Sequence, residues 1–361
     1  MKRGISQFSA VLAALAATGC CHYGRSARHA APAPVPAALA APFSYPKQTN
    51  CPSLEREIAL KPGYAVKRVE LQIPSESSGT NRVIEFDFYK PASSGPRPVL
   101  LVLPVMGGKH YDLEEIFARY FARHGLAAII LRRERWSETQ GIAVIDPMLR
   151  QTVIDNKHVI DWIETRPELD ATRIGVFGAS MGGIKGVLLA ALDDRVRASV
   201  LGLAGGDLPY VLAQTTEPGV KRQRERLLRS EHLTLDEFQA RLKQSITCDP
   251  LAFAPYIDPD KVLMFVALFD TVVPNTRGRE LRAKMGNPEM VLLPTGHYTA
   301  ALCIPYIENQ SLKFFQRKLG GVTGDARRSI TLDGPAFQQR SNGVTAITSG
   351  GAPPASHARD R

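Results

Sequence analysis

The pattern of apolar and polar residues predicts alternating strands and helices over a folded domain from residue 51 to residue 320. In 65–73 and 83–89, apolar and polar side chains alternate, which is typical of an antiparallel pair at a sheet edge. Residues 99–103 and 127–131 are continuous apolar runs, which suit the buried interior of a parallel sheet. Further strands are expected at 173–177, 198–203, 262–268 and 289–293.

Segments with the helical spacing of apolar residues separate these strands. They cover 112–124, 152–165, 181–192, 276–285 and 300–319. Repeated strand–helix units predict the α/β class, with a doubly wound, mostly parallel sheet and right-handed crossovers. Residues 207–254 interrupt this pattern with amphipathic helix, including a capping box from Thr234 to Glu237. We therefore expect a helical cap inserted before the strand at 262.

The first 20 residues have the features of a secretory signal. A positive start at Lys2 and Arg3 precedes an apolar run at 11–17, which is too short to span a membrane. The small residues that follow lead to Cys20, and 17–20 resembles the lipobox of bacterial lipoproteins, whose cysteine is acylated. We expect export to the cell envelope and a lipid anchor on Cys20, with plain secretion after cleavage elsewhere as the alternative.

Two further segments are expected to lie outside the folded domain. Residues 21–50 are rich in Ala and Pro, which predicts a tether that buries no core. Residues 321–361 are rich in Gly, Ser, Ala and Arg without sustained apolar periodicity, which predicts a disordered tail.

The net charge of +10 does not predict a nucleic-acid partner. Lys and Arg are spread along the chain, and in their densest stretch, 221–243, acidic residues are interleaved with them. The five cysteines form no CxxC or Cys/His pattern, so the sequence indicates no metal site and specifies no disulfide pairing.

A nucleophilic serine is indicated at the end of the strand 173–177. The segment Gly178-Ala179-Ser180-Met181-Gly182 follows this strand and opens the next helix. A sharp turn in this position lifts a serine hydroxyl clear of the sheet, and glycines are needed where the backbones crowd. We therefore predict Ser180 as the attacking group.

A serine hydroxyl needs a base to remove its proton and an acid to orient that base. Asp270 stands directly after the strand 262–268, and His297 follows the strand 289–293. Both lie where the carboxyl ends of parallel strands bring side chains together, so we predict a triad of Ser180, Asp270 and His297. Two rival acids, Asp258 and Asp260, precede the strand at 262 instead of following it.

An oxyanion hole requires two N–H donors aimed at the developing negative charge. The first is expected from Met181, directly after the nucleophile. The second is expected from the loop after the strand 99–103, where Pro104 has no N–H; we predict Met106, with Val105 or Gly107 as alternatives.

Together these motifs resemble the α/β-hydrolase superfamily over about residues 75–319, especially its dienelactone-hydrolase and acetyl-esterase-like branches. The segments that carry the resemblance are 103–108, 161–167, 173–183, 270–274 and 296–297. The chain departs from those branches in two places: loop 104–108 lacks the usual His-Gly start, and Ser180 stands where dienelactone enzymes have cysteine. The resemblance implies a serine hydrolase that cleaves a small-molecule carboxylic ester without a metal or cofactor.

Other functions fit the same motifs. An exopeptidase of the prolyl-oligopeptidase type or an acyltransferase would use the same triad, and a non-catalytic envelope or binding lipoprotein could use the same scaffold. In the expected cap, Leu208, Tyr210, Val211 and Leu212 form an apolar face that either lines an acyl pocket or packs the cap onto the domain.

Overall fold

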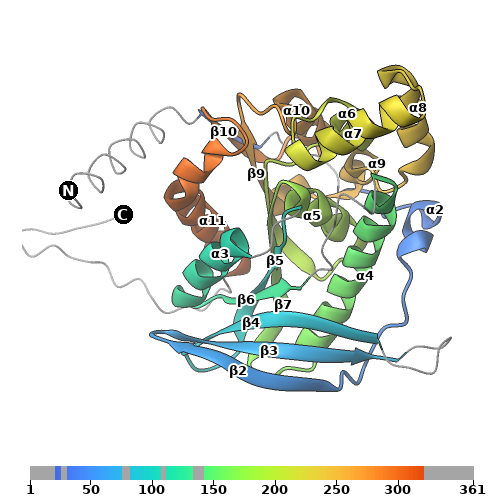
Figure 1. The fold of residues 1–361 in the computed structure, drawn as a ribbon. Coiled ribbons are helices and arrows are strands. Elements are labelled where there is room, and N and C mark those ends of the chain that lie inside the picture. Colours follow the sequence, from blue (N-terminus) through green and yellow to red (C-terminus); the bar gives the residue numbers. More distant parts are fainter. Residues whose placement is uncertain (1–20, 26–30, 75–81, 107–110, 133–141, 321–361) are drawn as a thin grey trace, which may run out of the picture. The chain divides into compact units, whose positions relative to one another are not determined.

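The computed structural model describes residues 21–25, 31–74, 82–106, 111–132 and 142–320 (Figure 1). The expected signal segment with Cys20, the tail 321–361 and Gly107 of the oxyanion loop lie outside the described residues.

Within the described residues, ten strands form one sheet in the order β1-β10-β9-β8-β7-β5-β6-β4-β3-β2 (Figure 1). The strands are β1 (Cys21–Tyr23), β2 (Ser53–Lys61), β3 (Tyr64–Ile73), β4 (Arg82–Pro91), β5 (Arg97–Leu103), β6 (Ala127–Leu131), β7 (Leu169–Ala179), β8 (Val196–Gly202), β9 (Val262–Ala267) and β10 (Glu289–Leu293). The six central strands, β10, β9, β8, β7, β5 and β6, pair in parallel with one another. Strand β1 pairs antiparallel with β10 at one end of this set, and β4, β3 and β2 follow β6 in antiparallel pairs at the other end. The doubly wound, mostly parallel sheet is confirmed, and so is the early antiparallel pair, β3 with β4.

Helices cover both faces of this sheet (Figure 1). They are α2 (Ala37–Ala40), α3 (Asp112–Arg123), α4 (Ile145–Glu164), α5 (Met181–Leu192), α6 (Leu208–Gln214), α7 (Pro218–Ser230), α8 (Leu235–Ser245), α9 (Pro250–Phe253), α10 (Asn275–Lys284) and α11 (Ile304–Leu319). Helices α3 and α11 pack with one set of buried strand residues, and α4, α5 and α10 pack with another. Four of the helices, α6 to α9, lie where the sequence predicts the cap, and Thr234 and Glu237 form the expected capping box.

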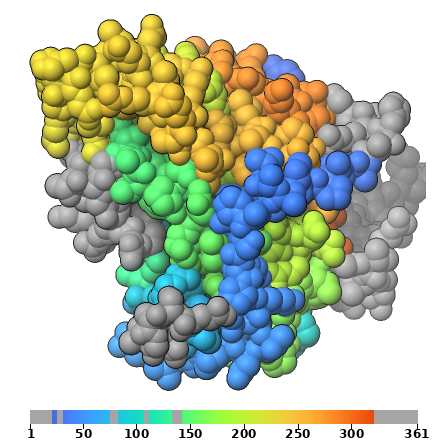
Figure 2. All heavy atoms as spheres, turned by 90° about the vertical axis from the view of Figure 1, so that its right-hand side faces the viewer, coloured from blue at the N-terminus to red at the C-terminus, as the bar shows by residue number. Residues whose placement is uncertain are grey.

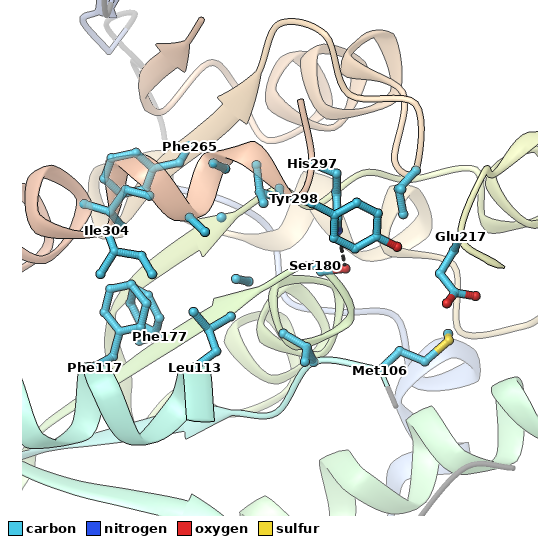
Figure 3. Close-up of a pocket in the computed structure, with 18 residues that line it drawn as sticks. Met106, Leu113, Phe117, Phe177, Ser180, Glu217, Phe265, His297, Tyr298 and Ile304 are labelled. Atoms are coloured by element: carbon cyan, nitrogen blue, oxygen red, sulfur yellow. Dashed lines mark hydrogen bonds between the residues drawn. The ribbon is translucent and has the colours of Figure 1, made fainter. Parts of the chain in front are cut away.

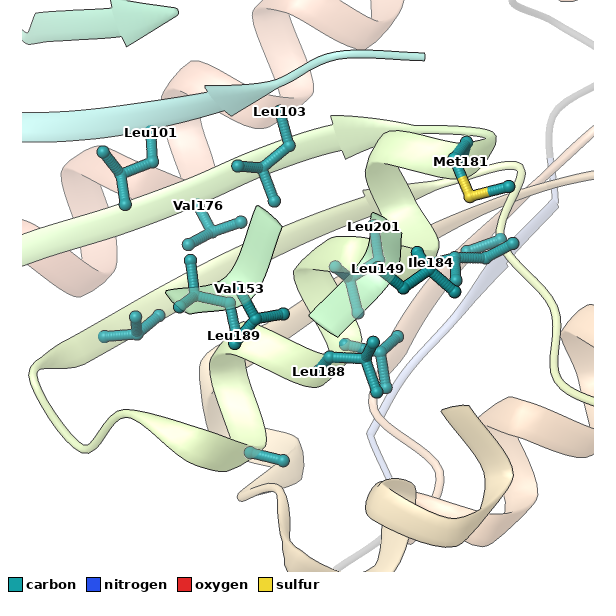
Figure 4. Close-up of a cluster of buried hydrophobic side chains, with 14 of the residues drawn as sticks. Leu101, Leu103, Leu149, Val153, Val176, Met181, Ile184, Leu188, Leu189 and Leu201 are labelled. Atoms are coloured by element: carbon teal, nitrogen blue, oxygen red, sulfur yellow. The ribbon is translucent and has the colours of Figure 1, made fainter. Parts of the chain in front are cut away.

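Strand β5 shows why the central strands are apolar along their whole length. Val99, Leu101 and Leu103 belong to the core under α4 and α5, whereas Leu100 and Val102 belong to the core under α3 and α11. Since side chains alternate between the two faces of a strand, a sheet covered by helices on both faces needs apolar residues at every position. Figure 4 shows the first of these cores, in which side chains of β5, β7 and β8 meet those of α4 and α5.

The expectation that residues 21–50 are a tether that buries no core is wrong for the described residues 31–50. Phe43 is 2% exposed and packs edge-on against Phe253, and the hydroxyl of Tyr45 donates to Asp161 of α4 at 2.9 Å. In Figure 2 this segment, in blue, lies against α4, in green. Phe43 and Tyr45 together hold the segment, and ordering it costs little side-chain entropy because Ala and Pro have almost none to lose.

Strand β2 was not predicted, because its apolar residues do not follow one buried face. Leu54 and Leu60 are 66% and 74% exposed. Its pairing with β3 contains an irregularity between Glu57 and Ala59, and among the described residues no strand pairs with its outer edge.

None of the helices in the described residues is long and apolar enough to cross a lipid bilayer.

Candidate active site

The turn between β7 and α5 holds Ser180 in a strained backbone conformation. Its φ is +54°, a region that a residue with a side chain enters only when the surroundings force it. The serine N–H donates to the carbonyl of Gly202 in β8 at 2.8 Å, which anchors the turn to the sheet. A methyl group on Gly178 would overlap the backbone of Gly182, and one on Gly182 would overlap the Leu103 carbonyl. Glycine is therefore required at both positions, and the side chain of Ser180 stands at the carboxyl edge of the sheet.

The three side chains predicted to act together are adjacent in the structure (Figure 3). His297 Nε2 lies 3.0 Å from Ser180 Oγ, and His297 Nδ1 lies 2.8 Å from Asp270 Oδ2. In the tautomer protonated at Nδ1, the ring donates to Asp270, and Nε2 can accept the hydrogen of the serine hydroxyl.

Backbone hydrogen bonds fix the carboxylate of Asp270. Its Oδ1 accepts the N–H groups of Val272 and Val273 at 2.9 and 2.8 Å, which leaves Oδ2 for His297. The side chain is only 2% exposed, so the imidazole meets a fixed and largely desolvated negative charge.

The rival acids have other partners, at the opposite end of β9. Asp258 accepts the N–H of Asp260, and Asp260 pairs with Arg25. Neither carboxylate is therefore available to the histidine.

In the predicted oxyanion loop, buried charged side chains bind both the carbonyl and the N–H of one peptide group. The carbonyl of Pro104 accepts from Lys185 Nζ at 3.2 Å, and the N–H of the same peptide, that of Val105, donates to Glu114 Oε1 at 2.7 Å. Lys185 is 1% exposed and Glu114 is 3% exposed. The Val105 N–H already donates to Glu114 and is therefore not free to bind an oxyanion, so this structure does not support Val105 as the alternative donor. Met106 follows directly and lines the cavity beside Ser180.

Lys185 and Glu114 were not expected from the sequence to be part of the site. A signal for the lysine exists: it is the one charged residue in Met181–Leu192, a helix apolar on every side. A helix of that kind is buried, and a buried lysine needs a specific partner.

A cavity of about 300 Å³ opens beside Ser180 (Figure 3). Polar groups of Ser180, His297, Tyr298 and Glu217 surround its mouth. Apolar side chains line the remainder, from α3, β7, β9 and α11: Leu113, Phe117, Phe177, Phe265, Ile304 and Ile307.

The apolar face of the cap packs against the domain and lies apart from this cavity. Leu208 and Leu212 are 1% and 3% exposed within the main core, and Val211 packs on Val272 and Val273. These three cap residues border a smaller cavity of about 50 Å³, which Ser180 also lines. Tyr210 stacks with Arg277, 4.7 Å from its ring centroid.

In the described part of the chain, no three His, Cys, Asp or Glu side chains come together as metal ligands would.

Residues 48–214 match the model of a family described as FrsA-like esterases. Esterase FrsA of Enterobacter sp. (strain 638) is 26% identical over 159 residues, which is 42% of this chain and 34% of that protein. Esterase FrsA of Salmonella typhi is 26% identical over 141 residues, 37% of this chain and 30% of that protein. The chain thus matches about a third of the length of these curated relatives.

Among the solved structures that resemble most of the chain are two acetyl xylan esterases. An acetyl xylan esterase from Paenibacillus sp. R4 has a TM-score of 0.57 at 20% identity, covering 75% of this chain and 90% of that one. Acetyl xylan esterase 1 from Thermoanaerobacterium sp. JW/SL YS485 has a TM-score of 0.55 at 18% identity, covering 76% and 94%. The protein has the α/β-hydrolase fold.

Within this fold, the family match includes Ser180 but ends before Asp270 and His297. The placement of the acid and the histidine therefore rests on the strands β9 and β10 that precede them.

Proposed function

We propose that the protein is a serine hydrolase that cleaves carboxylic esters through Ser180, His297 and Asp270. The observation that carries this proposal is a chain of hydrogen bonds that starts at Ser180, on the strained turn after β7, and runs through His297 to Asp270. The partial matches to proteins named esterases support the choice of an ester as substrate.

The mechanism follows from the positions of these groups. Ser180 Oγ attacks the ester carbonyl carbon while His297 Nε2 takes the hydroxyl proton, and Asp270 stabilises the imidazolium. The N–H groups of Met181 and Met106 hold the oxyanion of the tetrahedral intermediate. His297 then gives its proton to the leaving alcohol, and an acyl-enzyme remains on Ser180. A water molecule, deprotonated by His297, attacks this acyl group and releases the acid, which restores the free serine.

The test compares purified wild type with Ser180→Ala on p-nitrophenyl butyrate, with Ser44→Ala as a control at an exposed serine. We expect a loss of at least 10³-fold in kcat for Ser180→Ala, as for loss of a triad nucleophile, with an unchanged unfolding transition. A fluorophosphonate should label the wild type and the Ser44 variant but not the Ser180 variant. A folded Ser180→Ala protein that retains full activity would remove Ser180 from the mechanism.

The same proteins decide between the alternative activities. Cleavage of peptide p-nitroanilides with little action on esters would favour an exopeptidase, and ester formation with an added alcohol would favour acyl transfer. An unlabelled wild type without turnover would favour a binding protein on a hydrolase scaffold.

We also propose that the chain is exported and lipid-anchored at Cys20. The support is the sequence alone: a basic start, a short apolar run and small residues before that cysteine. Radiolabelled palmitate should enter the wild type and not Cys20→Ser; equal labelling of both proteins would overturn the proposal.

A further inference from the structure

Buried aromatic rings line the part of the cavity farthest from Ser180 (Figure 3). Phe117, Phe177 and Phe265 are 2%, 3% and 1% exposed, and the rings of Phe117 and Phe177 lie tilted against each other with their centroids 4.1 Å apart. In Figure 3 these rings lie together with Leu113 and Ile304, away from Ser180 and His297. The cavity thus leads from the serine to a wall of aromatic rings between α3 and α11.

The chemistry of the lining selects an apolar group. The polar groups lie at the mouth, where Glu217 and Tyr298 stand on the far side of Ser180 from the aromatic wall (Figure 3). Inside, the six side chains from α3, β7, β9 and α11 are all hydrocarbon. A sugar ring or peptide placed there would lose hydrogen bonds to water without replacement, whereas an alkyl chain gains from leaving water.

We propose that this cavity binds one unbranched alkyl chain of the ester, about six to ten carbons long, so that the enzyme prefers medium-chain esters to acetates of small alcohols. The inference rests on the proposed function, since it names the substrate class of that same site. The volume sets the upper limit: 300 Å³ has room for about ten groups of the size of a water molecule, which takes up roughly 30 Å³ in the liquid, and the mouth beside Ser180 uses part of that space.

The alkyl chain can belong to either side of the ester. If the large cavity holds the acyl chain, the alcohol leaves through the mouth. If it holds the alcohol, the acyl group must fit the smaller cavity of about 50 Å³, which has room for little more than an acetyl group. Two substrate series separate these arrangements: p-nitrophenyl esters of acids from acetate to palmitate, and acetates of alcohols from ethanol to hexadecanol.

For wild type, we expect kcat/KM to rise about threefold with each added methylene in one of the two series and to level off or fall beyond about ten carbons. A rise in the acyl series assigns the cavity to the acyl chain, and a rise in the alcohol series assigns it to the alcohol. If acetate esters are cleaved but neither series rises, the alkyl-chain site is wrong while the esterase stands. If no ester is cleaved and a fluorophosphonate does not label Ser180, both proposals fall.

Variants of helices α3 and α11 test whether this cavity sets the length of alkyl chain that the enzyme prefers. Leu113→Trp places a larger side chain in the cavity, and Ile116→Trp is its control, since Ile116 is 39% exposed on the same helix. We expect the ratio of kcat/KM for an eight-carbon chain to that for acetate to fall at least tenfold in Leu113→Trp only. Ile304→Ala, on α11, removes volume from the wall and should move the optimum to chains about two carbons longer. If the optimum stays at the wild-type length in every folded variant, the chain binds elsewhere and the inference is overturned.

Discussion

The peptide between Pro104 and Val105 is held by two buried charges, and Lys185→Met removes one of them. Methionine keeps most of the volume of the lysine stem but cannot donate to the Pro104 carbonyl, now 3.2 Å from Nζ. That carbonyl belongs to a buried residue, so leaving it without a donor costs about 1–3 kcal/mol. The loop can recover this energy by rotating the peptide toward water.

Rotation of this peptide would also turn the next N–H, that of Met106. Complete loss of one oxyanion donor costs about 3 kcal/mol, or 10²–10³ in kcat. Because the Glu114 contact remains, we expect a partial loss, about 10- to 100-fold in kcat. We expect KM to change less than twofold, since the oxyanion forms only after the substrate is bound.

The assay is steady-state kinetics on the best ester, together with thermal unfolding and the affinity of an alkyl boronic acid, which mimics the tetrahedral intermediate. Lys313→Met, at an exposed position of α11, is the matched control. Glu114→Gln should lose less activity than Lys185→Met, because its amide oxygen can still accept the Val105 N–H. A folded Lys185→Met protein with kcat and boronate affinity within twofold of wild type would show that the lysine does not hold the oxyanion loop.

Three further changes test other parts of the structure. Gly182→Ala should lower the free energy of unfolding by about 3 kcal/mol and reduce fluorophosphonate labelling, because the methyl group would overlap the Leu103 carbonyl. Burial lowers the pKa of His158, so this imidazole binds a proton more readily in the unfolded chain than in the folded protein. The wild type should therefore lose stability as the pH falls below about 6.5, and His158→Phe should lose less. The measurement is the Tm of both proteins between pH 7 and pH 5. Tyr45→Phe removes the hydroxyl that donates to Asp161 and should lower the free energy of unfolding in urea by about 1 kcal/mol.

Each of these changes has an outcome that contradicts its reasoning. Unchanged unfolding of Gly182→Ala would contradict the close approach of the turn to β5. Parallel Tm curves for wild type and His158→Phe would mean that the buried imidazole does not resist protonation. Equal stability of Tyr45→Phe and wild type would mean that this hydroxyl does not help to hold residues 31–50 on α4.

The sequence predicted the central fold and the geometry around the serine well. Strand β10 and helix α5 begin and end at the predicted residues, because each is a mainly apolar segment bounded by turn residues. The adjacency of Asp270 and His297 follows from topology: parallel neighbours β9 and β10 bring their carboxyl ends to the same edge of the sheet. Periodicity and strand order therefore sufficed for these side chains.

Other features depend on contacts that periodicity does not describe. Phe43 is one aromatic residue in an Ala- and Pro-rich stretch, and only the space beside Phe253 makes it a core residue. The peptide held by Lys185 and Glu114 joins three segments distant in sequence, so no local pattern indicates it. The size of the alkyl cavity depends on how rings from α3, β7 and β9 pack, which a linear pattern leaves open.

The form of β2 bears on how copies of the protein behave at high concentration. An outer strand offers unpaired N–H and carbonyl groups to any extended chain, and exposed Leu54 and Leu60 would add apolar contact to such a pairing. The irregularity between Glu57 and Ala59 breaks the regular spacing that another strand would need. Charged side chains at residues 55–57 would also have to line up with those of the incoming chain. The same strand that displays these leucines thus discourages edge-to-edge growth into larger sheets, and a regular β2 would make the protein prone to aggregate.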